Sequence, residues 1–329
     1  MSVIALANQK GGVAKTTSTL SLGAAWAEMG DRVLLVDCDP QAALTYSMGV
    51  DPEDLEVSLH DVFVGRAGIA DVLWEAHGCH IAPATIDLAG SEVFLLTKTG
   101  REFVLGRALT KVADAYDVVI IDCPPSLGIL TINALTAADE VIIPLQCESL
   151  SQRGMSHLLE TIEDVRQFTN PQLSIRGVIA TMFDPRTKHT REILSNVTDS
   201  YGLKVLEPPV RKSIRFAEAP AAGETIFQRA PSVPGAEAYR QIASELRDWA
   251  PEPAPAPEPA EDPQPVRDPH QAGEATRAES SRATPTATAG ADARGGDDLG
   301  TAANAPATPQ PPPERSVGFR TIPVDTDPL

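Results

Sequence analysis

Two lysines, two glycines and two threonines lie close together near the start of the chain, in the stretch Lys10-Gly11-Gly12-Val13-Ala14-Lys15-Thr16-Thr17. An apolar run precedes this stretch, and an alanine- and leucine-rich helical pattern follows it. Glycines let backbone N–H groups turn toward one point, and the beginning of a helix adds partial positive charge there. Such a turn binds phosphate groups, with Lys15 reaching the β- and γ-phosphates and Thr16 binding Mg²⁺. We therefore predict that residues 10–17 bind a nucleoside triphosphate with Mg²⁺.

Three aspartates end two further apolar runs. Asp37 and Asp39 end the run Val33-Leu34-Leu35-Val36, and their spacing of two places both on the same face at the tip of a strand. Asp122 ends the run Val118-Val119-Ile120-Ile121, as expected of an aspartate that holds Mg²⁺ through water. Phosphoryl transfer to water requires an oriented water molecule and a metal ion that neutralises charge. These aspartates are therefore candidates for both tasks.

The elements that must position these residues alternate along residues 1–249. Apolar runs predict strands at Val3–Ala7, Arg32–Val36, His80–Pro83, Val118–Ile121, Glu140–Pro144, Ile175–Thr181 and Leu203–Leu206. Helical patterns lie between them at Thr16–Met29, Thr99–Ala113, Gly154–Phe168, Thr190–Ser200 and Ala236–Asp248. Continuous β-branched runs favour parallel strands that are covered on both faces. We predict a doubly wound α/β fold with a mostly parallel sheet, helices on both faces and ligands at the carboxyl ends of the strands.

The phosphate-binding stretch departs from the usual G-x-x-x-x-G-K-[ST] pattern, because Gln9 and Ala14 stand at its glycine positions. It fits x-K-G-G-x-x-K-[ST] in full, and so resembles the deviant-Walker P-loop ATPases of the ParA/MinD family. The D-x-D-P-Q run at residues 37–41 and the D-x-P-P run at 122–125 resemble two further motifs of that family. The resemblance spans roughly residues 2–247. It implies ATP and Mg²⁺ as cofactors, and a slow ATPase.

The resemblance also implies roles for single residues. Lys10 matches the signature lysine that reaches the phosphates of a partner subunit's ATP, which implies a homodimer with ATP sandwiched in its interface. Asp39 matches the residue that positions the attacking water, with Asp37 supporting it or the metal shell, so the expected catalytic residues are Lys10, Lys15 and Asp39. The expected Mg²⁺ ligands are Thr16, Asp37 and Asp122. Ala14 stands where the family most often has glycine.

Basic residues gather in two stretches of the C-terminal half, and could neutralise nucleic-acid phosphates without reading bases. They are Arg186, Lys188, Arg191, Arg211, Lys212 and Arg215. The resemblance implies that Arg186 and Arg215 bind nonspecific DNA, and that a ParB-like partner or a cargo adaptor stimulates ATP hydrolysis. Val210-Arg211-Lys212 stands where the family usually has Ile-Pro-Arg, so this segment lacks the family's proline.

Several alternatives remain within and beyond this family. The motifs cannot separate partitioning of a chromosome or plasmid from positioning of a protein cargo, because the ATPase cycle is shared. A MinD-like membrane switch would need a basic amphipathic terminus, whereas residues 321–329 are acidic and interrupted by proline. A related tyrosine kinase would need a tyrosine-rich tail, and a nitrogenase-reductase relative would need a differently spaced cysteine from Cys123. A binding module with an inactive ATPase is disfavoured by the intact Lys15, Thr16, Asp39 and Asp122.

Composition divides the chain near residue 249. Residues 251–329 contain 16 of the 29 prolines and one aromatic residue, Phe319, so we predict an ATPase domain at 1–249 and a disordered tail at 250–329. The net charge is −18, which does not exclude a local basic surface. The four cysteines show no metal-binding spacing. Neither a signal peptide nor an apolar run of about 20 residues is present, which predicts a soluble cytoplasmic protein without a membrane partner, associated with the nucleoid when ATP is bound.

Overall fold

The apolar runs form the strands of a single eight-stranded sheet in the computed structural model, which describes residues 1–147 and 152–247. The predicted tail at 250–329 lies outside the described residues. The strands are β1 (Ser2–Leu6), β2 (Val33–Asp37), β3 (Trp74–Ala76), β4 (Cys79–Ala82), β5 (Val118–Asp122), β6 (Glu140–Gln146), β7 (Ser174–Thr181) and β8 (Val205–Leu206). All seven predicted strands are present, with their ends shifted by at most two residues.

The sheet has the strand order β3-β4-β2-β5-β1-β6-β7-β8, and its neighbouring strands are parallel except for β3 against β4. The strand β3 was not predicted, because three residues are too few to show a pattern. A two-residue turn joins it to β4, and both turn residues, His77 and Gly78, have positive φ angles of 55° and 74°. That geometry matches the twist of a hairpin.

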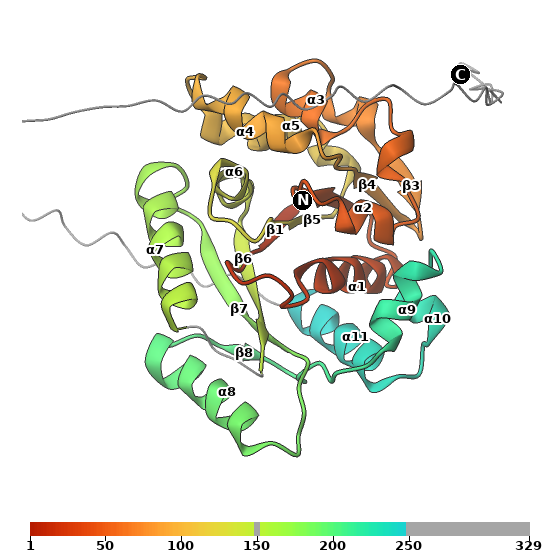
Figure 1. Ribbon diagram of the computed structural model, residues 1–329, viewed down its shortest axis with the longest axis vertical. Helices are drawn as coiled ribbons and strands as arrows, with labels where there is room; N and C mark the ends of the chain where they lie inside the picture. The colour runs from red at the N-terminus through yellow and green to blue at the C-terminus, as the bar shows by residue number, and fades with distance from the viewer. Residues whose placement is uncertain (148–151, 248–329) are drawn as a thin grey trace, which may run out of the picture. The chain divides into compact units, whose positions relative to one another are not determined.

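The two faces of the sheet carry separate hydrophobic clusters, because alternate residues of each strand point to opposite sides. On β1, Val3 and Ala5 belong to one cluster, whereas Ile4 and Leu6 belong to the other. The first face is covered by α3 (Leu59–Val64), α4 (Leu88–Leu96), α5 (Val104–Thr110), α6 (Ile129–Ala137), α7 (Gln152–Phe168) and α8 (Lys188–Tyr201). The second is covered by α1 (Lys15–Glu28), α2 (Ala43–Ser47), α10 (Ile226–Arg229) and α11 (Pro234–Arg247), with α9 (Arg215–Ala221) beside them (Figure 1).

The doubly wound fold is therefore confirmed, with two differences in its helices. The predicted helix at 99–113 is shorter, because Gly100 adopts a positive φ of 64° and a 3₁₀ turn (Arg101–Phe103) precedes α5. The helices α2, α3, α4, α6, α9 and α10 were not predicted. The helices α4 and α6 are mostly apolar, so the sequence shows no helical periodicity there, and the other four have at most seven residues, too few to show one.

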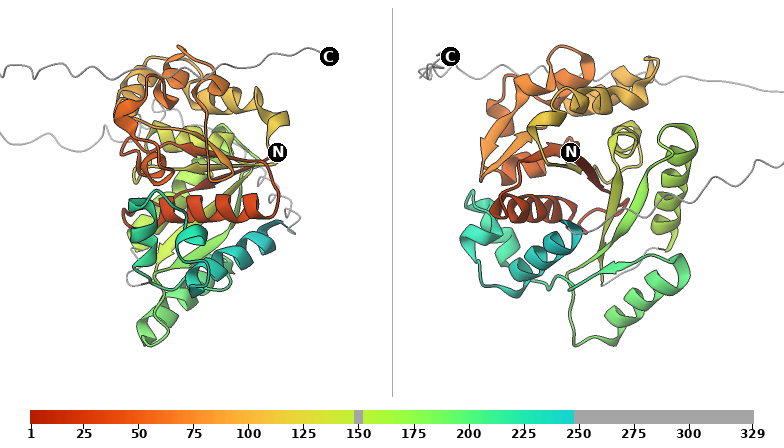
Figure 2. Two further views of the ribbon diagram at one scale, coloured as in Figure 1. Left: turned by 90° about the vertical axis from the view of Figure 1, so that its right-hand side faces the viewer. Right: turned by 180° about the vertical axis from the view of Figure 1, so that it is seen from behind.

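The last described helix, α11, lies side by side with α1 (Figure 2). The indole Nε1 of Trp26 donates a 3.0 Å hydrogen bond to the carbonyl of Ala243, and Arg247 forms an ion pair with Asp31 at 2.9 Å. A buried ion pair between Arg176 and Glu140, with a further hydrogen bond from Arg176 to the carbonyl of Leu246, joins β6, β7 and α11. The packed fold therefore extends at least to Arg247. No helix among the described residues is long and apolar enough to cross a membrane.

Candidate nucleotide-binding site

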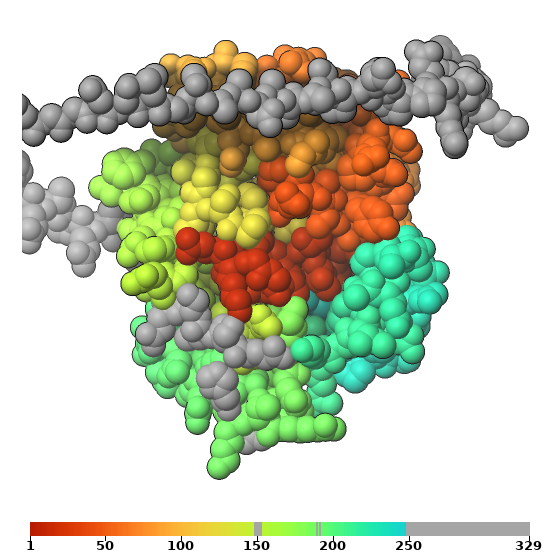
Figure 3. All heavy atoms as spheres, viewed as in Figure 1, coloured from red at the N-terminus to blue at the C-terminus, as the bar shows by residue number. Residues whose placement is uncertain are grey.

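The three predicted motifs meet at the carboxyl edge of the sheet. Asp37 at the end of β2 pairs in register with Asp122 at the end of β5, and Asp122 pairs with Leu6 at the end of β1. The loop of residues 7–14 leaves β1 at this point and enters α1 at Lys15. In the space-filling view, part of the red N-terminal segment is exposed between orange, yellow and green segments (Figure 3). The fold thus brings together residues that lie more than a hundred positions apart in the sequence.

The phosphate-binding loop turns through two left-handed residues. Gly12 has a φ of 73° and Ala14 has a φ of 68°, whereas Val13 between them is buried. Gly11 and Gly12 are exposed, and a Cβ atom at either position would meet nothing within 4 Å. The glycines therefore leave the backbone accessible to a ligand. The carbonyl of Ala14 accepts the first hydrogen bond of α1 from the N–H of Ser18, and the hydroxyl of Thr181 holds the carbonyl of Val13.

Ala14 is strained in this conformation, because a left-handed backbone costs a residue with a Cβ roughly 1–2 kcal/mol. We expect Ala14→Gly to raise the free energy of unfolding by up to about 1 kcal/mol, since the added flexibility of glycine in the unfolded chain offsets part of the gain. Urea denaturation would measure this. Ala42→Gly is the matched variant, because Ala42 also has a positive φ, of 53°. A loss of about 1 kcal/mol at Ala14, as for glycine within a right-handed helix, would contradict the strain.

Thr16 and Asp122 form the pair that fits a metal ion. The Thr16 hydroxyl donates a 2.6 Å hydrogen bond to Oδ2 of Asp122, while Oδ1 is buried without a hydrogen-bond partner among the described residues. Burial, together with the charge of Asp37, raises the pKa of Asp122 well above its usual range. A buried carboxylate oxygen beside a hydroxyl is the oxygen donor set that Mg²⁺ prefers. Mg²⁺ at this position would supply positive charge to the phosphates and keep Asp122 ionised.

Asp37 supports its neighbours from within the core. Its Oδ2 accepts hydrogen bonds from the backbone and hydroxyl of Thr45, at 2.8 and 2.7 Å, and its Oδ1 accepts one from the N–H of Asp39 at 3.2 Å. Burial raises the pKa of Asp37 to about 6, and these hydrogen bonds oppose the shift. Both carboxylate oxygens of Asp37 are thus occupied by hydrogen bonds within the protein. This arrangement favours the supporting role predicted for Asp37, whereas direct contact with Mg²⁺ stays a prediction.

The two lysines of the loop lie in different surroundings. Lys15, the first residue of α1, is only 7% exposed and lies close enough to lower the pKa of Asp122 and of Cys123. Lys10 is half-buried at the surface, and its ammonium donates a 2.9 Å hydrogen bond to Oε1 of Gln146. Lys15 is therefore placed to bind phosphates held by its own loop. Lys10 lies at the rim of the site, where the loop meets the protein surface.

A cavity of about 320 Å³ continues from the phosphate-binding loop. Ala14 and Thr17 form its near end, and Phe216 and Tyr239 line it with their rings packed edge to face at 5.8 Å. The Tyr239 hydroxyl is fixed by a 2.8 Å hydrogen bond with Ser18. An aromatic cavity that adjoins a phosphate-binding loop has the place and size for a nucleoside. Arg211 and Lys212 also line it, so the segment that departs from the family pattern borders this cavity.

Comparisons with known proteins agree with this geometry. The family model described as an AAA domain matches residues 1–175. Soj of Bacillus subtilis strain 168, a sporulation initiation inhibitor protein, is 44% identical over 246 residues, which cover 74% of this chain and 97% of Soj. The chromosome partitioning protein ParA of Caulobacter vibrioides is 40% identical over 248 residues, covering 74% and 93%. The chain belongs to the ParA/Soj family of P-loop ATPases.

A solved structure that is similar to this chain contains a bound nucleotide and magnesium. The Mycobacterium smegmatis protein named cobyrinic acid a,c-diamide synthase is 50% identical, with a TM-score of 0.68 over 75% of this chain and 94% of that chain. It was crystallised with ADP and magnesium, and with an ATP analogue and magnesium. ATP and Mg²⁺ are accordingly the cofactors of the present ATPase. The assignment of single residues to them rests on the geometry above and stays a prediction.

The two basic stretches of this ParA/Soj-type chain lie side by side. Phe183 and Arg211 form a β-bridge beyond the ends of β7 and β8, which joins the loop that holds Arg186 to the segment before α9. Arg186 is exposed. Arg215, the first residue of α9, is 50% exposed and donates a 2.6 Å hydrogen bond to Glu218. The structure thus brings the predicted DNA-binding stretches together, whereas contact with DNA stays a prediction.

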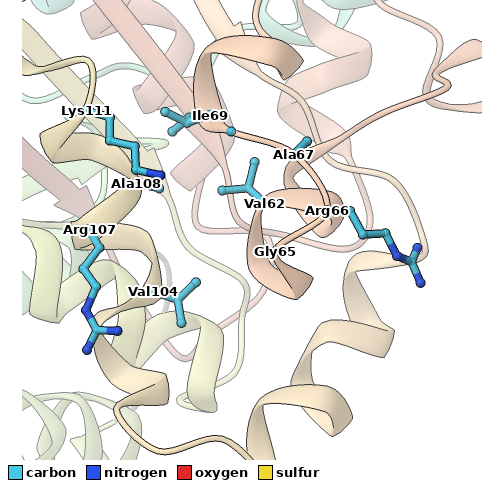
Figure 4. A pocket seen from close by; sticks show the side chains of 10 residues that line it. Val62, Gly65, Arg66, Ala67, Ile69, Val104, Arg107, Ala108 and Lys111 are labelled. Carbon is cyan, nitrogen blue, oxygen red and sulfur yellow. The ribbon is translucent and has the colours of Figure 1, made fainter.

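A second cavity, of about 430 Å³, lies between the end of α3 and α5 (Figure 4). Its lining is apolar at Val62, Ile69 and Val104, and it also includes three cationic residues, Arg66, Arg107 and Lys111. Figure 4 shows that the two guanidinium groups point away from one another. Because the charges do not converge, we place no ligand there.

The sequence interpretation missed the polar residues that hold the site in place. Thr45 fixes Asp37, Thr181 fixes the loop at Val13, and Asn8 and Gln146 hold Lys10. Gln146 and Thr181 are the last residues of their strands, β6 and β7. A polar residue at the end of an apolar run indicates a possible site residue. The sequence interpretation applied this signal to the aspartates but not to Gln146 or Thr181.

Proposed function

We propose that the chain is an ATP-dependent molecular switch. In this proposal it dimerises on Mg²⁺–ATP, binds nonspecific DNA as a dimer, and hydrolyses ATP slowly until a ParB-like partner stimulates it. The cycle would drive chromosome or plasmid partitioning in the cytoplasm, on the nucleoid while ATP is bound. The observation that carries the proposal is the different placement of the two lysines, because Lys15 is buried close to Asp122 whereas Lys10 lies half-buried at the surface, bonded to Gln146.

The residues of the site would divide the work as follows. Backbone N–H groups of residues 11–17 and the ammonium of Lys15 bind the phosphates, while Thr16 and Asp122 hold the metal. Asp39 orients the attacking water, because its Oδ1 already accepts a 3.0 Å hydrogen bond from the N–H of Gln41, which fixes the carboxylate. Lys10 completes the neighbouring subunit's site. Hydrolysis would then require both subunits.

DNA binding in the proposal depends on cations rather than on base recognition. Arg186 and Arg215 are exposed on stretches joined at the Phe183–Arg211 bridge, in a chain whose net charge is −18. Against that acidic background, a local basic surface would attract phosphates. A dimer would double this surface, and the affinity would fall steeply with salt because each contact releases counterions. DNA binding should therefore follow ATP binding.

Arg215→Glu is expected to abolish ATP-dependent DNA binding while dimerisation persists. The substitution removes a phosphate contact and places a second carboxylate beside Glu218. Retention on mixed-sequence DNA at low salt, with light scattering for the dimer, would measure both properties. Arg66→Glu is the matched control, because Arg66 is 70% exposed, also faces an acidic residue, Asp61, and lies on the other face of the sheet. Equal retention of wild type and Arg215→Glu would refute the assigned surface.

A ParA-like positioner of a protein cargo is the alternative within the family, because the same switch would serve either cargo. The name of the M. smegmatis structure suggests ATP-dependent amide synthesis instead. If glutamine supplied the nitrogen, that reaction would use an accessible nucleophile such as a cysteine thiolate. All four cysteines of this chain are buried, and burial raises the pKa of the Cys38, Cys79 and Cys123 thiols. The switch remains the better supported proposal.

The domain division belongs to this proposal. We propose that residues 1–249 carry the ATPase cycle, because the packing of Trp26 on Ala243 and the ion pair of Arg247 close the fold near that boundary. Residues 250–329 would not contribute to ATP binding. Their sequence carries 13 acidic and 6 basic residues, so they would not strengthen DNA binding.

A further inference from the structure

Lys10 is held by an extension of the sheet beyond the end of β1. The β1–β6 ladder pairs residues 136 positions apart, ending at Leu6 and Ile142. The same offset continues through side chains, because Nδ2 of Asn8 donates to the carbonyl of Pro144 at 2.8 Å and Nζ of Lys10 donates to Gln146 at 2.9 Å. The loop therefore follows β6 in register for four residues after its own strand has ended.

The sequence of β6 suits this extension. Proline has no N–H to give to a neighbouring strand, and Pro144 lies where the β1 ladder has stopped, so no ladder bond is lost on that side. The side chain of Asn8 is buried and takes the place of the backbone hydrogen bonds to β6. Its Oδ1 also accepts a 3.0 Å hydrogen bond from the N–H of Lys10. Both the backbone and the ammonium of Lys10 are thus fixed relative to β6.

We propose that Gln146 is a positioning residue for Lys10, and that it orients the ammonium toward the nucleotide of a second copy of this chain. The inference rests on the proposed function, because that function gives Lys10 its target. A lysine has a long flexible side chain, and ordering it on binding costs entropy. An acceptor that holds the side chain beforehand reduces that cost. An ammonium has three N–H donors, so the bond to Gln146 can persist while another donor engages a phosphate.

The opposite role would be restraint, in which Gln146 withholds Lys10 from the second subunit. Two variants of nearly equal shape separate these roles. Gln146→Met removes the acceptor, whereas Gln146→Glu keeps an acceptor oxygen at the same position. Orientation predicts that methionine weakens the dimer and glutamate preserves it. Restraint predicts that methionine strengthens the dimer and that glutamate, which holds an ammonium more tightly, weakens it.

The test measures the dimer dissociation constant of the full chain by sedimentation, with Mg²⁺ and a nonhydrolysable ATP analogue. We expect Gln146→Met to raise this constant by about tenfold, the effect of one hydrogen bond to a charged group, and Gln146→Glu to stay near the wild type. ATP affinity at low protein concentration should not change. Gln172→Met is the matched control, because Gln172 is exposed before β7 at the opposite edge of the sheet.

A double-mutant comparison shows whether the effect passes through Lys10. In a Lys10→Ala background, Gln146→Met should weaken the residual dimer no further. An equal loss in both backgrounds, an unchanged dimer in Gln146→Met, or a stronger one would each overturn the inference. Amine labelling of Lys10 in the nucleotide-free chain, expected to be faster in Gln146→Met, tests the hold on Lys10 separately. If the wild type stayed monomeric while Lys10 was still labelled faster in Gln146→Met, the hold on Lys10 would stand and the proposed switch would be overturned.

Discussion

Asp39→Ala is expected to bind ATP about as tightly as the wild type and to hydrolyse it at least about a hundredfold more slowly, the usual range for loss of a group that directs proton transfer or water. Asp39 is half-buried beyond the tip of β2, outside the phosphate-binding loop. Among the described residues, the carboxylate of Asp39 accepts a hydrogen bond from the N–H of Gln41 in the adjoining turn and from no residue of the phosphate-binding loop. Nucleotide binding and dimerisation should therefore survive the substitution.

The consequence would be a trapped state. A chain that binds ATP but cannot hydrolyse it should accumulate as a dimer on DNA, so phosphate release and DNA retention should change in opposite directions. Asp54→Ala is the control, because Asp54 is an exposed aspartate in a nearby turn after α2. If Asp39→Ala hydrolysed ATP at the wild-type rate, Asp39 would have no part in the mechanism, and Asp37 and Asp122 would remain as candidates.

The sequence predicted those site residues whose side chains can themselves bind a phosphate or a metal ion. Lys15, Thr16 and Asp122 follow or end apolar runs, and parallel strands must align their carboxyl ends, so their convergence could be deduced. The structure confirms it through the in-register pair of Asp37 and Asp122 and the bond from Thr16. The fold was predictable for the same reason, because six of the strands have four to eight residues each and show a continuous apolar run.

The remaining features depend on distance in the fold rather than on local pattern. Gln146 reaches Lys10 across 136 positions, and nothing near either residue indicates the contact. Nothing in the sequence around Thr45 indicates a role, but in the fold its hydroxyl donates a hydrogen bond to Asp37. The positive φ of Ala14 could be suspected only from the family's glycine, since alanine itself indicates a right-handed helix. A polar residue at the end of an apolar run can mark Gln146 as a candidate, but its contact with Lys10 becomes visible only when the register of the strands is known.

The second large effect concerns the two lysines of the loop, which should fail at different steps. Lys15→Ala is expected to lower ATP affinity at least about a hundredfold, because charge-assisted hydrogen bonds to phosphate are each worth roughly 1.5–3 kcal/mol. Lys15 is also buried close to Asp122, so its removal takes a neighbouring cation away from that acidic cluster. Lys10→Ala, in contrast, should bind ATP nearly normally, because Lys10 lies at the rim, bonded to β6.

The difference should appear when binding and association are measured on the same samples. Equilibrium binding of a fluorescent ATP analogue should be lost in Lys15→Ala and retained in Lys10→Ala, whereas light scattering with Mg²⁺–ATP should find both variants monomeric. Lys111→Ala is the control, an exposed lysine just after α5, and should behave as the wild type in both assays. A Lys10→Ala chain with an unchanged dimer fraction would show that Lys10 does not act across a subunit boundary. The rim position would then need another explanation, and hydrolysis within a single subunit would become the simpler mechanism, because every remaining residue of the site belongs to one chain.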